Sequence, residues 1–158
     1  MISVQIGAYY NLQKSYGGAT SKTSIQCGSP VTGNSSGTNL ICVSTLINYG
    51  NGTAIWYNRT DVPADWNLYQ LTLVLANNVE SSFSSFYNEH YVKGINGVVE
   101  QGRNHWTVWI FCQNQDGWAI APVGADKIAL AKYQTLAWAY QVPYQPPVPG
   151  AKQVDPCS

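Results

Sequence analysis

The sequence predicts an α+β fold, in which several strands form a sheet beside one helix. Three observations lead to this class. Residues 2–12 alternate in polarity, which is typical of a strand. Residues 40–50 are also strand-like and end in Gly-Asn-Gly, which together with the apolar segment that follows indicates an N-terminal hairpin. Residues 61–80 then carry leucines at helical spacing.

The segment 61–80 fits both strand and helix periods. The letters LTLVL alternate as in a strand, whereas the apolar residues from Leu68 to Val79 also follow a helical stripe. The run is long and lacks glycine, and Asp61 or Asp65 is available as an N-cap before Trp66. We therefore predict a helix that ends near the Asn-Asn pair at 77–78.

Residues 105–112, HWTVWIFC, predict a central strand, because they are apolar on both faces. Strand alternation places Trp106 and Trp109 on opposite faces of it. Before this strand we expect a short strand and a Gly-Ile-Asn-Gly turn within 81–97. After it, residues 117–130 and 132–142 are expected to supply further strands.

The chain divides into one domain, residues 1–142, and a proline-rich linker or stalk, residues 143–158. Within the domain, residues 13–39 are rich in Gly, Ser and Thr and have no period, which indicates a long loop or insertion. A stalk at this position would lead to a further segment, such as an anchor.

Composition points to an extracellular or cell-surface protein. Only 10% of the residues are charged and the formal net charge is zero, which argues against nucleic acid as a partner. No apolar stretch is long enough for a membrane span. Glycosylation sequons begin at Asn34, Asn51 and Asn58. We expect a glycoprotein with a neutral surface rich in amides and hydroxyls.

The four cysteines, Cys27, Cys42, Cys112 and Cys157, favour disulfides over zinc, because none belongs to a C-x-x-C pair. Three pairings are available to four cysteines. We favour Cys27–Cys42, which would close the long loop, and Cys112–Cys157, which would fix the tail to the domain. Free buried thiols are the alternative.

The sequence contains no recognised catalytic or metal-binding motif. The chain has no G-x-S-x-G, H-E-x-x-H or P-loop motif, and no two carboxylates form a close pair in sequence. His90 and His105, even with Glu89, Asp116 or Cys112, match no metal-ligand spacing. We therefore expect no metal, no cofactor and no enzymatic activity.

Four motifs in the second half follow one another in a known order: the turn GING at 94–97, the strand WTVW at 106–109, GADKIAL at 124–130 and WAY at 138–140. This order, over residues 66–141, resembles the transcobalamin-like C-terminal domain family, the β-domain of cobalamin carriers and its relatives. Two segments depart from the family pattern, Tyr133-Gln134 before the last strand and the loop 112–117.

The resemblance implies a β-grasp-like mixed sheet packed on one helix. In the cobalamin carriers a separate helical barrel holds the other face of the ligand, and this chain has no such barrel. We therefore do not expect this domain to bind cobalamin by itself.

The function predicted from these features is non-catalytic binding of a small molecule or carbohydrate. Aromatic rings beside a polar loop offer stacking surfaces and hydrogen bonds. The expected ligand-binding residues come from the loop 96–104 and the tryptophans beside it: Asn96, Arg103, Asn104, Trp106, Trp109 and Trp118. The same residues also fit a plain hairpin connection and an aromatic core.

A second function fits the sequence as well. Low charge, sequons and a proline-rich stalk are compatible with a structural subunit of a surface filament, pilus, S-layer or adhesin. In that case the domain would assemble with copies of itself on the cell surface.

Overall fold

The computed structural model describes residues 40–112, 117–133 and 135–142. The strand predicted at 2–12, the loop predicted at 13–39 and the linker predicted at 143–158 lie outside these residues. Of the described residues, 58% are in strands or bridges and 14% are helical.

The largest element is a five-stranded sheet with the order β2-β1-β8-β6-β7. Its strands are β1 (Leu40–Asn48), β2 (Ala54–Pro63), β6 (His105–Cys112), β7 (Gly117–Ile120) and β8 (Thr135–Gln141). β1 and β8 run parallel, and the other neighbours are antiparallel. The predicted hairpin of residues 40–58 is therefore confirmed as β1 and β2, and β6 is confirmed as a strand with neighbours on both sides.

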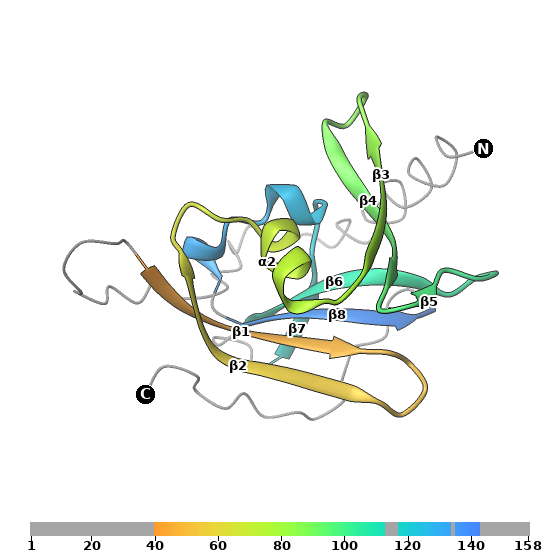
Figure 1. Cartoon of the computed structure of the whole chain (residues 1–158), viewed down its shortest axis with the longest axis horizontal. Helices are drawn as coiled ribbons and strands as arrows, with labels where there is room; N and C mark the ends of the chain where they lie inside the picture. Colours follow the sequence, from red (N-terminus) through yellow and green to blue (C-terminus); the bar gives the residue numbers. More distant parts are fainter. Residues whose placement is uncertain (1–39, 113–116, 134, 143–158) are drawn as a thin grey trace, which may run out of the picture.

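A separate three-stranded sheet has the order β3-β4-β5. It consists of β3 (Val79–Ser84), β4 (Glu89–Ile95) and the short β5 (Val98–Val99). The turn between β4 and β5 holds Asn96 and Gly97, both at positive φ, so the chain reverses at the predicted Gly-Ile-Asn-Gly motif. The β3–β4 hairpin projects away from the larger sheet (Figure 1).

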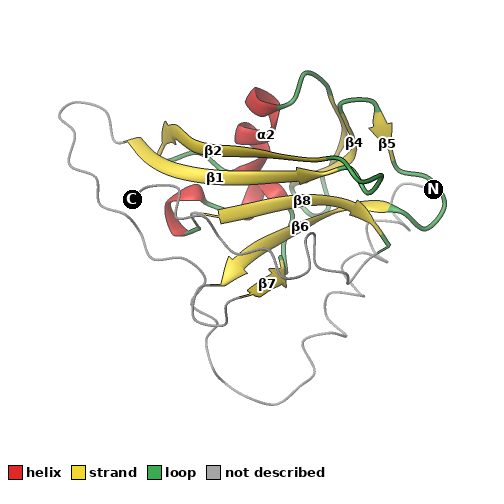
Figure 2. Cartoon of the chain, turned by 90° about the horizontal axis from the view of Figure 1, so that it is seen from below, coloured by secondary structure: helices red, strands yellow, loops and turns green. Residues whose placement is uncertain are grey.

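The helix α2 (Leu68–Leu75) and the 3₁₀ helices η2 (Ala125–Lys127) and η3 (Leu130–Lys132) lie on one face of the larger sheet (Figure 1). Leu68 and Leu71 of α2 pack with Ile47, Trp106 and Trp138 in the main core. Burying these side chains is the main favourable term that holds the helix on the sheet. Figure 2 shows the same sheet from its other side.

The opposite face carries a smaller cluster of Leu46, Trp109, Ala137 and Ala139. Trp106 belongs to the main core, so the two tryptophans of β6 lie on opposite faces, as strand alternation predicts. Both side chains are buried.

The start of α2 corrects one prediction. The N-cap is Asn67, not Asp61 or Asp65. The Asn67 side chain accepts a hydrogen bond from the main-chain N–H of Gln70 (2.9 Å), and the Gln70 side chain accepts one from the N–H of Asn67 (2.9 Å). This reciprocal pair is a capping box. The predicted helix is confirmed, but it ends at Leu75, before Asn77-Asn78.

The predicted α+β, β-grasp-like class is wrong, because the described residues are mostly β and contain two sheets rather than one. Two segments account for the difference from the predicted class. Residues 79–99 pair among themselves instead of joining the larger sheet. Part of the segment that was expected to supply strand forms the 3₁₀ helices η2 and η3 instead, so among the described residues β7 and β8 are the strands that follow β6.

Among the described residues no disulfide supports the predicted long loop closed by Cys27–Cys42, and Cys27 itself lies outside these residues. The described cysteines, Cys42 and Cys112, are not free thiols. Cys27 and Cys157 lie outside the described residues.

Candidate functional site

A small pocket lies between the smaller sheet, η2 and the core of the larger sheet. It has room for a group about the size of one water molecule. Its lining combines apolar core residues with polar residues of β4 and its neighbours: Ser84, Glu89, His90, Tyr91, Val92, Trp106, Val108, Gly124, Ala125 and Trp138.

Two of the lining residues, Trp106 and Trp138, which are called here the floor of the pocket, are held by hydrogen bonds as well as by packing. The Trp106 Nε1–H donates to the carbonyl oxygen of Val98 (2.9 Å), which ties β6 to the smaller sheet. The Trp138 Nε1–H donates to Thr72 Oγ1 on α2 (2.8 Å). Hydrogen bonds therefore hold both rings in place.

Glu89 supplies a buried carboxyl group to the pocket. It is only 4% exposed, and the backbone of Gly124 hydrogen-bonds to it. Burial raises the pKa of Glu89 above its ordinary value of 4.5; Asp126 also raises it, whereas the Gly124 bond and Lys127 lower it. Among the described residues no cation forms an ion pair with Glu89.

Gly124 is required beside Glu89 for steric reasons. A Cβ atom at position 124 would lie 2.6 Å from Glu89 Oε2 and 2.7 Å from Glu89 Cδ. Any other residue would force the carboxyl group to move.

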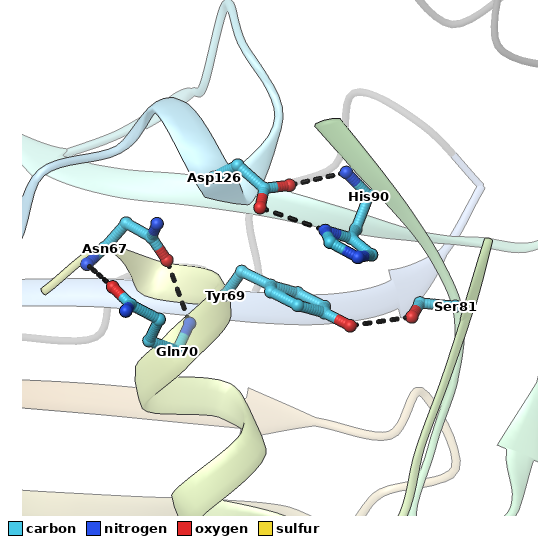
Figure 3. A network of polar contacts seen from close by, with 6 residues as sticks. All are labelled: Asn67, Tyr69, Gln70, Ser81, His90 and Asp126. Carbon is cyan, nitrogen blue, oxygen red and sulfur yellow. Dashed lines mark hydrogen bonds and ion pairs between the residues drawn. The ribbon is translucent and has the colours of Figure 1, made fainter. Parts of the chain in front are cut away.

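His90 lines the pocket, and it contacts residues of η2 and α2 (Figure 3). Its Nδ1 lies 3.1 Å from Asp126 Oδ1, and its main-chain N–H donates to Asp126 Oδ2. The imidazole stacks on the Tyr69 ring, with centroids 4.1 Å apart and planes 8° from parallel. The Tyr69 hydroxyl is 2.8 Å from Ser81 Oγ. Through His90, β4 therefore contacts η2 and α2, and Tyr69 extends this set of contacts to β3.

We expect the Glu89→Gln variant to differ most from the parent protein at high pH. A raised folded-state pKa means that the folded protein holds this proton more tightly than the unfolded chain. The stability that Glu89 contributes is full below about pH 4.5 and is lost as the pH rises through the raised pKa. Glutamine stays neutral, so the variant should gain stability relative to the parent across this range.

Urea unfolding at a series of pH values would check this expectation, with Glu80→Gln as the control, because Glu80 is an exposed carboxylate on β3. A difference between Glu89→Gln and the parent that does not change with pH would contradict it.

The three loop residues that were predicted to bind a ligand, Asn96, Arg103 and Asn104, lie outside the pocket lining. Asn96 Oδ1 accepts hydrogen bonds from the main-chain N–H groups of Asn77 (2.7 Å) and Asn78 (3.3 Å), and its Nδ2 donates to the Tyr49 hydroxyl (2.7 Å). Its side chain thus holds the start of β3 against the turn. Arg103 and Asn104 are exposed in the turn before β6.

The predicted tryptophans lie in three places. Trp106 lines the pocket. Trp109 is buried on the other face of the sheet, where its Nε1–H donates to Thr107 Oγ1 (2.9 Å). Trp118 is half-buried in β7 and meets Phe111 edge to face, with centroids 5.2 Å apart. Of the six predicted ligand-binding residues, Trp106 alone lines this pocket.

The sequence interpretation missed Gly124 and Asp126 as site residues, and it weighed Glu89 and His90 only as metal ligands. His90 and Asp126 lie 36 positions apart, so no local pattern links them. The adjacent Glu-His pair at 89–90 in a short strand was the available signal. In the part of the chain that the structure describes, no three His, Cys, Asp or Glu side chains gather as metal ligands would.

His105 forms a second histidine–carboxylate pair, away from the pocket floor. Its Nδ1 lies 3.3 Å from Glu100 Oε2, which also accepts a hydrogen bond from the Tyr91 hydroxyl. Among the sequons, Asn51 and Asn58 are exposed, on the β1–β2 turn and on β2 respectively. Asn34 lies outside the described residues.

No protein-family model matches this chain, and no curated protein matches it. The resemblance to transcobalamin-like domains therefore stays a prediction. Across the described ranges, every helix is too short or too polar to cross a membrane.

Proposed function

We propose that this domain is a non-catalytic, extracellular or cell-surface module that binds a small molecule or sugar in the pocket beside β4. The observation that carries the proposal is a rigid floor of Trp106 and Trp138 with a buried carboxyl group, Glu89, in its wall. Concave apolar sites with a few convergent polar groups are the usual form of ligand sites.

The small size of the pocket restricts how a ligand binds. A head group of about one heavy atom with its hydrogens enters, and the rest of the ligand lies over the rim. Tyr91 and His90 line the pocket at that rim. Phe83 meets His90 edge to face, with centroids 5.1 Å apart, and is exposed, so it extends the aromatic surface outward.

The polar groups beside the pocket are hydrogen-bonded to one another. His90 pairs with Asp126, and the Tyr69 and Ser81 hydroxyls pair with each other. These bonds hold the wall in place. The exposed sequons Asn51 and Asn58 and the low charge support an extracellular location.

Intrinsic tryptophan fluorescence tests the proposal, because two indoles form the floor. We expect a panel of monosaccharides, amino sugars and small amines to include ligands that change the emission saturably. The matched variants are Ser84→Leu, which fills the lining, and Ser85→Leu, the same change at the exposed neighbour.

Ser84→Leu should weaken binding by at least about tenfold, whereas Ser85→Leu should leave it unchanged. Circular dichroism establishes that both variants fold. Equal affinities for the two variants would place the binding elsewhere, and no response from any member of the panel would remove the support for this function.

A second candidate function, a self-assembling structural subunit, is favoured by one observation. Phe86, in the connection between β3 and β4, is 87% exposed. An aromatic ring displayed in this way is available for contact with another molecule. Light scattering of the parent protein and of Phe86→Ser distinguishes the two functions. Large species that disappear in the variant support assembly, and a monomer in both cases argues against it.

A further inference from the structure

The charges around the pocket restrict the ligand further. Among the described residues no lysine or arginine lines the pocket, and Lys127, which acts on Glu89 through its charge, is exposed and outside the lining. Glu89 is the carboxyl residue of that described lining, and Asp126 of η2 also acts on it through its charge. An anionic head group would meet carboxyl oxygens and aromatic faces and no countercharge.

Glu89 itself is incompletely compensated. A buried carboxylate is stable in a protein when it is paired with a cation or accepts several hydrogen bonds. Within the described residues, the structure gives Glu89 a hydrogen bond from the backbone of Gly124 and no ion pair. A carboxylate offers about four acceptor positions on its two oxygens, so Glu89 has capacity for a further donor that carries positive charge.

We propose that the head group is a protonated primary amine, which donates hydrogen bonds to Glu89 while its charge lies against the pocket's aromatic residues. This inference rests on the proposed function of the pocket. Trp106, Trp138 and Tyr91 all line it, and aromatic faces attract cations. A primary ammonium is close in size to a water molecule and fits the space, whereas a quaternary ammonium does not.

Amine binding is coupled to the proton on Glu89. The raised pKa keeps more of the carboxyl neutral at mildly acidic pH, and the ammonium group binds the ionised form. The charged groups that act on Glu89 are Asp126 and Lys127 of η2, and the titratable groups of its own strand that line the same pocket are His90 and Tyr91. Affinity therefore rises with pH through the raised pKa, and binding releases a proton.

Isothermal titration with four benzyl compounds tests the ligand class. Benzylamine, benzyl alcohol, benzoate and benzyltrimethylammonium share one ring and differ in the charge and size of the head group. We expect benzylamine to bind about tenfold or more tightly than benzyl alcohol, because a hydrogen bond to a charged group is the stronger one. We expect no binding of benzoate or benzyltrimethylammonium.

The variants Glu89→Gln and Glu80→Gln are the matched pair. Glu89→Gln should reduce the affinity for benzylamine to that for benzyl alcohol and abolish proton release, which is measured by titration in buffers of different ionisation enthalpy. Glu80→Gln should change neither quantity.

Two failures are distinguishable. Equal binding of alcohol and amine by the parent protein would overturn the amine inference and leave the binding pocket standing. Absence of binding by all four compounds, together with a silent fluorescence panel, would overturn both proposals.

Discussion

Replacing Trp106 with alanine is expected to lower the free energy of unfolding by about 3–5 kcal/mol. The side chain is 2% exposed, and its ring meets Tyr49 edge to face with centroids 5.7 Å apart. The substitution opens a cavity in the main core. It also removes the Nε1–H bond to Val98, so a carbonyl group of the smaller sheet loses its indole donor.

Urea unfolding followed by far-ultraviolet circular dichroism measures this effect without relying on the deleted fluorophore. Leu73→Ala is the control, because Leu73 is half exposed on α2; it should change stability by about 0.5 kcal/mol or less. A loss of less than about 1 kcal/mol for Trp106→Ala would mean that the two sheets are not held together by this ring.

Replacing Gly50 with alanine is expected to cost at least about 2 kcal/mol, from two additive causes. Gly50 has φ +72°, a conformation that residues with a Cβ adopt at a cost. In addition, a Cβ atom there would lie 2.2 Å from the carbonyl oxygen of Tyr140, which belongs to the backbone of β8. The end of β8 would have to move away from the β1–β2 turn.

Gly52→Ala is the matched control for this prediction. Gly52 lies in the same turn at φ +92°, but a Cβ atom there meets nothing within 4 Å. It should therefore show the conformational cost alone. Thermal and urea unfolding of the two variants give the difference, and equal losses would show that the close approach of β8 has no energetic weight.

The parts of the fold that sequence reasoning predicted are those encoded over short distances. The β1–β2 hairpin, the helix at Leu71 and the two-faced strand of Trp106 and Trp109 each follow from local periodicity and turn residues. The Asn67–Gln70 capping box was readable too, since Asn and Gln stand three positions apart just before the apolar run.

The prediction of the fold class was wrong because a strand can pair with a segment that is far away in the sequence. Residues 79–99 carry strand and turn signals, but nothing local tells whether they extend one sheet or form their own. The residues of the pocket could not be predicted for the same reason. Its wall needs Glu89 beside Gly124 and His90 beside Asp126, and neither contact is visible from sequence spacing. The order of turn, polar loop and tryptophan strand predicted a binding site at the loop 96–104 and the tryptophans beside it, but Trp109 is buried.

The parallel pairing of β1 with β8 has a consequence for how the molecule is made. It places the first and last described strands side by side at the centre of the sheet, with Ser44 opposite Thr135. During synthesis one edge of β1 and one edge of β6 therefore remain without their β8 partner until β8 has left the ribosome. Closing so large a loop is slow, and bare edges invite pairing with other chains. Nascent protein that stops before position 135 should therefore need a chaperone to stay soluble.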